Sequence, residues 1–424
     1  MRQASSPHIV THYDVNLTRT RRNPLKGFYT DYSWHYHGPN DFPASLEFAY
    51  LPLSALMDGP SSFTFDTGLE PRLQAAAARF QQLIIRVFID YPHKPSGLPG
   101  FLKGKVHMNN YTEHGGGQSP DYNDPDLRKA ILSFIEALGR RYDGDRRLGI
   151  VQLGLLGYWG EWHTSPHTNW FPDTQFQDEV LKAYDTAFQT TLLQVRYPTK
   201  ESMKYRVGFH DDSFAQDTIG SRGWFFHNRF LKLGAGDRWK NVSIGGELRP
   251  ELQNEIFEDS YTTGDFRQNF AQCANTTHLS NLLYGGAFNN RAHDSAKERQ
   301  NAEDAALSMG YAYHVPRTVL NGSTLHVDIQ NIGVAPFYPR VYLQVSDSAQ
   351  VSSFVQVMLP RLTPDMGTMT FDLDVISLSP PSVSSPWRLS LESDYILLQQ
   401  DVLLATQPSD DVIRIACPKS SSVC

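Results

Sequence analysis

Residues 148–163 carry the sequence LGIVQLGLLGYWGEWH, in which a long apolar run leads directly into aromatic, acidic and imidazole side chains. Such a run predicts a strand buried on both faces, as in a parallel sheet covered by helices. An acid that follows the carboxyl end of such a strand lies where α/β barrels carry out their chemistry. Glu161 is therefore the first candidate catalytic residue. The alternative is that it caps the next helix or pairs with an arginine.

The surrounding region, residues 23–309, alternates short apolar runs with helix-like segments, which is typical of parallel strands joined by crossover helices. Fewer than eight strands can be recognised, so a closed (β/α)8 TIM-like barrel is an inference from this alternation. Strands are predicted over 83–90, 148–156, 205–210, 242–247 and 279–283, and helices over 70–82, 126–141, 177–197 and 296–308.

The pattern changes after about Gly310. Segments 324–330, 341–345 and 387–392 alternate apolar and polar residues between turns rich in Pro, Gly and Ser, with no helical window among them. This spacing predicts an antiparallel, all-β sandwich. The predicted organisation is an N-terminal extension (1–22), a catalytic barrel (23–309), a C-terminal β-sandwich (310–416) and a tail (417–424).

Charge and hydropathy exclude several classes of partner. The net charge is −7 and no Lys/Arg cluster is dense enough to follow a phosphate backbone, so no nucleic acid partner is expected. No apolar window is long enough for a membrane span. Residues 1–6 carry no apolar signal-peptide core, so either a leader is absent from this chain or the protein stays inside the cell.

The glycosylation sequons favour the first of these alternatives, a secreted protein that has lost its leader. Five Asn residues begin an Asn-X-Ser/Thr sequon: Asn16, Asn110, Asn241, Asn275 and Asn321.

The three cysteines do not contradict an extracellular location. Cys417 and Cys424 could close a small loop over the Ser-rich tail, which would leave Cys273 unpaired and buried. No Cys/His spacing resembles a zinc site, and no cofactor is predicted.

Three other predicted strands also end in acidic residues, or in basic residues that could pair with them. One strand contains Arg86 and ends at Asp90, another ends in His210-Asp211-Asp212, and a third ends in Glu247, with Arg249 after it. Carboxylates brought together at one rim repel one another and lower the stability of the fold, unless cations pair with them or they take part in binding or catalysis. Taken singly, Asp90 and Asp211 could equally cap helices, Arg86 could be a buried counter-charge, and Asp211 with Asp212 could bind calcium.

Glu161 and Glu247 form the predicted catalytic pair. Glycoside hydrolysis commonly needs two carboxyl groups, one protonated to release the leaving group and one ionised to attack or to activate water. The setting between Trp159 and Trp162 favours a protonated Glu161, while the glycines before Glu247 allow close approach. Glu161 is thus expected to be the acid/base and Glu247 the nucleophile or base, with the reverse assignment left open.

A carbohydrate substrate is the predicted partner, because sugar rings bind on aromatic faces and their hydroxyls bind polar side chains. The predicted substrate-binding residues are Tyr32, Trp34, Arg86, Asp90, Trp159, Trp162, His163, His210, Asp211, Asp212 and Arg249.

Five short motifs, in order along the chain, resemble the DUF4832 proteins, which often carry a DUF4874 region in front. The resemblance implies a glycoside hydrolase with a TIM barrel and a C-terminal β-sandwich, and it names no substrate. The chain departs from the family at Ala312, where Arg is usual, and at Ser213, where Cys is common. The motifs are 23–28 (NPLKGF), 157–163 (GYWGEWH), 208–212 (GFHDD), 245–247 (GGE) and 331–337 (NIGVAPF).

Two other functions remain open at this stage. A non-catalytic carbohydrate-binding protein would keep the aromatic residues but would not need two facing carboxyl groups. A structural extracellular protein would use the sandwich as its working part, and would expose an aromatic or hydrophobic patch there.

Overall fold

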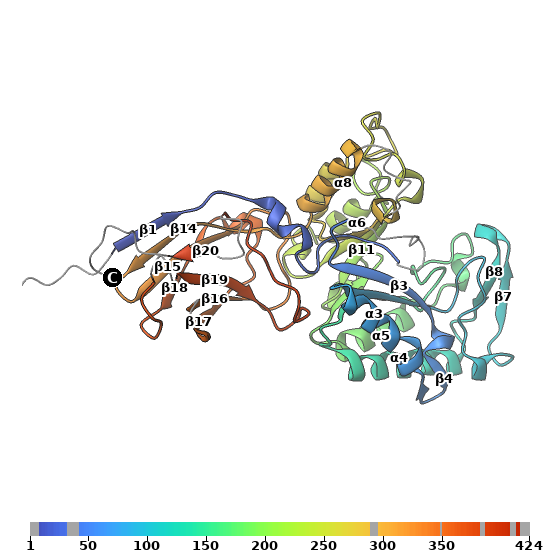
Figure 1. The fold of residues 1–424 in the computed structure, drawn as a ribbon. Helices are drawn as coiled ribbons and strands as arrows, with labels where there is room; N and C mark the ends of the chain where they lie inside the picture. Colours follow the sequence, from blue (N-terminus) through green and yellow to red (C-terminus); the bar gives the residue numbers. More distant parts are fainter. Residues whose placement is uncertain are drawn as a thin grey trace, which may run out of the picture.

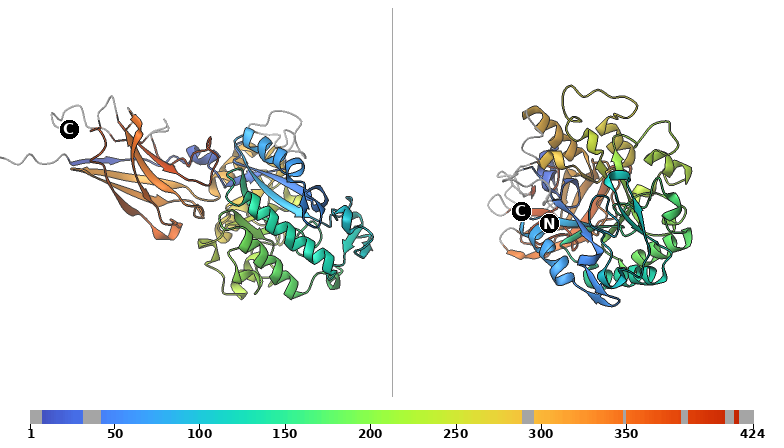
Figure 2. Two further views of the ribbon diagram at one scale, coloured as in Figure 1. Left: turned by 90° about the horizontal axis from the view of Figure 1, so that it is seen from below. Right: turned by 90° about the vertical axis from the view of Figure 1, so that its right-hand side faces the viewer.

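A computed structural model describes residues 8–31, 42–288, 296–347, 350–381, 386–407 and 413–415 of the 424-residue chain. It shows two bodies arranged end to end, a barrel and a β-sandwich (Figure 1). Seen along its axis, the barrel has helices around a central ring of strands (Figure 2). Among the helices within these ranges, none is long and apolar enough to cross a membrane.

The barrel is a single sheet in which every neighbouring pair of strands is parallel. The last strand pairs with the first, and a parallel bridge between Asp31 and Phe48 joins the first strand to the second, so the sheet closes. The predicted eight-stranded barrel is confirmed. Its strands are β2 (Gly27–Tyr29), β3 (Leu46–Pro52), β6 (Gln82–Phe88), β9 (Leu148–Gln152), β10 (Leu192–Val195), β11 (Gly208–Phe214), β12 (Ile244–Leu248) and β13 (Asn281–Leu283).

The helices cover the outside of this sheet, and the predicted 126–141 helix shows why they begin where they do. Its N-cap is Asp124, whose carboxylate accepts the backbone N–H groups of Asp126 (2.9 Å) and Leu127 (3.0 Å), and Pro125 takes the first helical position. The described helices are α2 (Phe65–Gly68), α3 (Glu70–Ala78), α4 (Pro125–Tyr142), α5 (Thr174–Ala187), α6 (Phe226–Lys232), α7 (Phe270–Thr277) and α8 (Ala296–Ser308).

Two hairpins extend the loops of the barrel: β4 (Met57–Gly59) with β5 (Ser62–Phe63), and β7 (Met108–Tyr111) with β8 (Gly117–Pro120).

The predicted helix over 177–197 is wrong, because it combines a helix and a strand. α5 ends at Ala187, and β10 begins at Leu192. Between them, the carboxylate of Asp143 accepts the backbone N–H groups of residues 189, 190 and 191, which gives the chain hydrogen bonds that a continuing helix would otherwise supply. The fifth strand of the barrel was hidden in this segment.

The sandwich consists of two antiparallel four-stranded sheets, as predicted. One has the order β1 (His8–His12), β14 (Tyr313–Asn321), β15 (Thr324–Asn331) and β18 (Met369–Asp374). The other has the order β17 (Gln350–Met358), β16 (Tyr342–Asp347), β19 (Trp387–Glu392) and β20 (Ile413–Ile415). Because β1 pairs along its whole length with β14, the residues predicted to be a separate N-terminal extension supply a strand of the sandwich.

The sandwich packs against the amino ends of the barrel strands. The hydroxyl of Tyr395, in the loop after β19, accepts the backbone N–H of Leu192 (3.0 Å) and donates to the carbonyl of Gly149 (2.7 Å). One buried cluster joins Ile84 and Ile150 of the barrel to apolar residues of the sandwich. This leaves the carboxyl ends of the strands, at the far end of the barrel, for the functional site.

Replacing Tyr395 with phenylalanine should lower the free energy of unfolding by about 1–3 kcal/mol, because it leaves a buried N–H and a buried carbonyl without their partner. Urea unfolding would measure the loss. Tyr342→Phe is the matched control, because its hydroxyl makes no hydrogen bond in the part of the chain that the structure describes. Equal stabilities of the two variants would mean that the Tyr395 hydroxyl does not hold the two bodies together.

Candidate functional site

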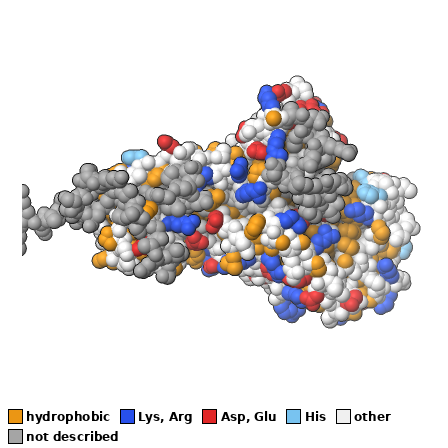
Figure 3. All heavy atoms as spheres, in the orientation of Figure 1, with side chains coloured by type: hydrophobic (Ala, Val, Ile, Leu, Met, Phe, Trp, Pro, Cys, Tyr) orange, Lys and Arg blue, Asp and Glu red, His pale blue; other side chains and the backbone are white. Residues whose placement is uncertain are grey.

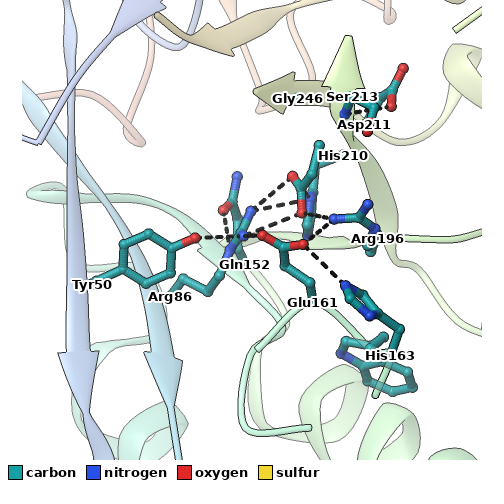
Figure 4. Close-up of polar contacts among 12 residues, drawn as sticks. Tyr50, Arg86, Gln152, Glu161, His163, Arg196, His210, Asp211, Ser213 and Gly246 are labelled. Carbon is teal, nitrogen blue, oxygen red and sulfur yellow. Dashed lines mark hydrogen bonds and ion pairs between the residues drawn. The ribbon is translucent and has the colours of Figure 1, made fainter. Parts of the chain in front are cut away.

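An ionic cluster lies at the carboxyl ends of the central barrel strands (Figure 4). Arg86 of β6 donates to Asp212 of β11 at 3.1 Å and 3.3 Å, and its Nη1 lies 3.4 Å from Glu161. Arg196, the residue after β10, donates through Nη1 both to Glu161 and, at 2.7 Å, to Asp212. Two guanidinium groups thus alternate with two carboxylates across four neighbouring strands.

A tight loop after β9 returns Glu161 to this cluster. Gly157 and Gly160 have φ values of 78° and 69°, and a Cβ on Gly157 would lie 2.3 Å from a backbone oxygen. Trp159 also has a positive φ, 53°, which few side chains adopt. The backbone N–H of Glu161 donates to the carbonyl of Tyr158 at 2.8 Å. The glycines of the GYWGEWH motif therefore serve to direct the carboxylate of Glu161 back over the barrel.

Arg86 is the centre of the cluster, and it is buried inside the barrel. Its guanidinium also donates to Gln152 (2.9 Å) and to the hydroxyl of Tyr50 (2.9 Å), which fixes its plane. A buried cation needs nearby anions. Asp212 supplies one: burial alone would raise its pKa, but Arg86, His210 and Arg196 hold that pKa well below its ordinary value.

His210 is fully buried on the same face of β11, two residues from Asp212, and its Nδ1 lies 2.7 Å from that carboxylate. Burial lowers the pKa of His210, which opposes the effect of Asp212, and Arg86 lowers it further. The contact between the imidazole and the carboxylate helps to orient Asp212.

Glu161 has an ionic environment and not the apolar one predicted from its neighbours. Besides the two arginines, His163 lies 3.5 Å away through Nε2. Trp162 turns into the core, where its indole N–H donates to the carbonyl of Leu153 at 2.6 Å. Trp159 packs against the ring of His163. The two tryptophans therefore do not form the apolar surroundings of Glu161 that were predicted from the sequence.

Glu247, at the end of β12, has the opposite environment. Its carboxyl group makes no hydrogen bond or ion pair within the described ranges. Burial, together with the negative charges of Asp212 and Glu161, raises its pKa to about 8. Burial and the charges of Glu247 and Glu161 likewise raise the pKa of Tyr91 to about 12. The two glutamates therefore share one electrostatic neighbourhood but differ in their contacts, because among the described residues arginines contact Glu161 and not Glu247.

Not all predicted site residues join this cluster. Asp211 points to the other face of β11, where it accepts the hydroxyl of Thr218 at 2.7 Å, because successive strand residues alternate. Asp211 and Asp212 therefore cannot hold one calcium ion together. No group of three or more His, Cys, Asp and Glu side chains suited to a metal ion occurs in the described ranges.

Four other predicted residues lie outside the cluster or outside the described residues. Asp90 accepts the hydroxyl of Tyr111 at 2.5 Å, and burial raises its pKa to about 6. Arg249 pairs with Glu251 at 2.6 Å. The structure does not describe two aromatic residues, Tyr32 and Trp34. Cys273 is a free, buried thiol, and both other cysteines lie outside the described ranges.

The sequence did not identify Arg196 or Tyr50 as site residues. Arg196 follows a strand that was predicted to be the end of a helix, and β3, which carries Tyr50, was not predicted at all. A signal was present: Arg196 follows the run 191–195 (TLLQV), which alone would suggest a buried strand with a cation at its end.

Glu247→Gln should stabilise the protein increasingly as pH rises. The pKa of Glu247 is about 8 in the folded chain against an ordinary 4.5, so wild type loses stability between these pH values while the amide does not. The full shift corresponds to about 5 kcal/mol. Because the Glu247 side chain is partly exposed to solvent, we expect a stability difference of about half that value.

Denaturant unfolding of both proteins at pH 5 and pH 8.5 would measure this difference. A stability gap that is the same at both pH values would show that Glu247 titrates normally.

No protein-family model matches the chain, so the resemblance to the DUF4832 proteins stays a prediction. No curated protein matches it either. Among solved structures, endo-glycoceramidase II from Rhodococcus sp. in complex with a five-membered iminocyclitol is 12% identical, over 86% of this chain and 99% of that chain, with a TM-score of 0.41. GH5_18 from Bifidobacterium longum subsp. longum is 11% identical over 67% and 79%, with a TM-score of 0.41. A likeness this distant carries no argument about function, so the assignment depends on the side chains at the barrel mouth.

Proposed function

We propose that the protein is a glycoside hydrolase that acts on a polysaccharide or glycan through Glu161 and Glu247. The observation that carries the proposal is the contrast between these two neighbouring carboxyl groups. Two guanidinium groups contact Glu161, whereas none in the described ranges contacts Glu247, whose pKa is raised to about 8. Environments that separate the protonation of two acids in this way are what general acid catalysis beside an ionised carboxylate requires.

In this mechanism one glutamate donates a proton to the glycosidic oxygen as the bond from that oxygen to the anomeric carbon breaks. The other attacks the anomeric carbon, or removes a proton from a water that attacks it. The environments favour Glu247 as the proton donor and Glu161 as the ionised partner. These roles of Glu161 and Glu247 are the reverse of those predicted from the sequence, where the tryptophans were expected to favour a protonated Glu161.

The other members of the cluster position Glu161. Arg86 and Arg196 orient its two oxygens, and Asp212, held by His210, orients the arginines. Trp159 is half-buried and packs on the rings of His114 and His163. Its indole would supply an aromatic face for a sugar ring at the rim of the site.

The alternative is a carbohydrate-binding protein without catalysis. One observation favours it: both oxygens of Glu161 already have arginine partners, so the carboxylate must leave a contact in order to react. Such a protein would bind glycans without releasing any product.

An extracellular location is part of the proposal. Four of the five sequon asparagines, Asn110, Asn241, Asn275 and Asn321, are exposed. Basic and acidic side chains are interspersed over the face in Figure 3, which supports a neutral glycan over a nucleic acid as partner.

The test is a screen of the purified full chain against a panel of polysaccharides and glycans, with release of reducing ends as the readout and Glu161→Gln as the inactive reference. Turnover by wild type alone would support the hydrolase. Binding without turnover would support the alternative, and equal turnover by both proteins would point to a contaminating enzyme.

A further inference from the structure

A cavity of about 670 Å³ lies at the opposite end of the barrel from Glu161, between the barrel and the sandwich. The barrel contributes the amino end of β10 and the segments before β10, β11 and β12, and the sandwich contributes residues around Tyr338 and Tyr395. Ligand sites are common at such domain interfaces, and this volume is in their usual range. Four arginines line it: Arg206, Arg238, Arg340 and Arg361.

These guanidinium groups are poorly balanced by acids. Arg206 pairs with Asp185 at 3.2 Å. Among the described residues, Arg361 donates only to carbonyls, those of Asn241 (3.1 Å) and Tyr338 (3.0 Å). Arg340 is exposed, and its guanidinium has no partner in the described part of the chain. Carbonyl groups satisfy hydrogen-bond donors without neutralising their charge, so the lining keeps a net positive charge.

Arg238 adds to this imbalance. One of its Nη atoms donates to the carbonyl of Tyr205, but its Nε is buried and has no hydrogen-bond partner within the described ranges. Burial lowers the pKa of Arg238, and the carboxylate of Asp185 offsets this only in part. The acid that lines the cavity, Asp394, lies 3.3 Å from Arg146, which is not part of the lining.

We propose that this cavity is a second binding site, for an oxyanion group carried by an acidic saccharide or present as a free inorganic anion. Arginine binds carboxylate, sulfate and phosphate groups through paired N–H donors. The exposed hydroxyl of Thr190, also in the lining, suits the uncharged part of such a ligand. The site is independent of the hydrolase proposal, because none of its lining residues belongs to the Glu161 cluster.

Titration calorimetry at low salt would test the site on the full chain, produced without glycans because Asn241 lines the cavity. The probes are inorganic phosphate, digalacturonate and, as the neutral counterpart, cellobiose. Arg340→Gln should weaken anion binding about tenfold or more, because a charge-assisted hydrogen bond is lost. Arg388→Gln, an exposed arginine of β19 outside the lining, is the matched control and should leave binding unchanged.

Tighter binding of digalacturonate than of phosphate would identify an acidic saccharide as the ligand, and the reverse would identify a free anion. The proposal is overturned if neither anion binds, if cellobiose binds as well as the anions, or if Arg340→Gln and Arg388→Gln behave alike. Digalacturonate bound at the Glu161 end of the barrel would have the same affinity for wild type and for Arg340→Gln. Binding at that end therefore cannot produce the loss of affinity that we expect from Arg340→Gln. Arg340 lies at the surface, so Arg340→Gln should fold normally. Anion binding to Arg361→Gln gives a second test of the same site.

Discussion

Replacing Glu161 with glutamine should lower kcat/KM by about 10²–10⁴-fold or more, whichever chemical role the carboxylate has. The amide keeps the shape of the side chain, and its oxygen can still accept a hydrogen bond from Arg196 or Arg86. Folding and glycan binding should therefore be nearly unchanged. Activity on the substrate found by the screen, together with calorimetric binding of that substrate, would measure both effects.

Glu136→Gln is the matched control, because Glu136 is an exposed residue of α4 whose partner is Arg140. It should retain full activity. If Glu161→Gln is as active as this control, Glu161 has no part in the reaction, and the hydrolase proposal fails with it.

The pH dependence of kcat/KM should distinguish the two role assignments by its sign between pH 7 and pH 9. If Glu247 enters the reaction protonated, activity falls as pH rises through its pKa of about 8. If Glu247 must be ionised to attack, activity rises over the same interval. We expect the fall, as the basic limb of a bell-shaped profile.

Azide rescue of the two alanine variants checks the same assignment by product stereochemistry. Azide can occupy the space of the carboxylate that attacks or activates water, and then forms a glycosyl azide as the anomeric C–O bond breaks. We expect Glu161→Ala to give the azide of inverted configuration and Glu247→Ala not to give it. The opposite pattern, with activity rising between pH 7 and pH 9, would restore the roles predicted from the sequence.

Much of the site follows from where residues stand in the sequence. Arg86, Glu161, His210, Asp212 and Glu247 all lie in or near the ends of apolar runs, and in a parallel barrel those ends meet at one rim. The two-residue period of a strand would also have separated Asp211 from Asp212, once His210 was placed facing inward.

The partners of each charge could not be predicted in the same way. Glu161 contacts Arg86 and Arg196 because β6, β9 and β10 are neighbours in the sheet, a property of strand order and not of local sequence. Arg196 was not predicted because the strand before it, β10, was not predicted. The turn that precedes β10 depends on the distant carboxylate of Asp143. The burial of Glu247 close to Asp212 and Glu161 likewise arises from side chains on several strands.

The pairing of β1 with β14 has a consequence for how the chain is completed during synthesis. His8 lies opposite Asn321, so β1 has no neighbour until roughly 300 more residues have been synthesised. At translation rates of about 5–20 residues per second, that interval lasts about 15–60 s. During it, the apolar amino end of the barrel and the unpaired first strand both remain uncovered, and such surfaces are prone to association between chains. Nascent chains of this protein are therefore natural clients for chaperones until the sandwich closes.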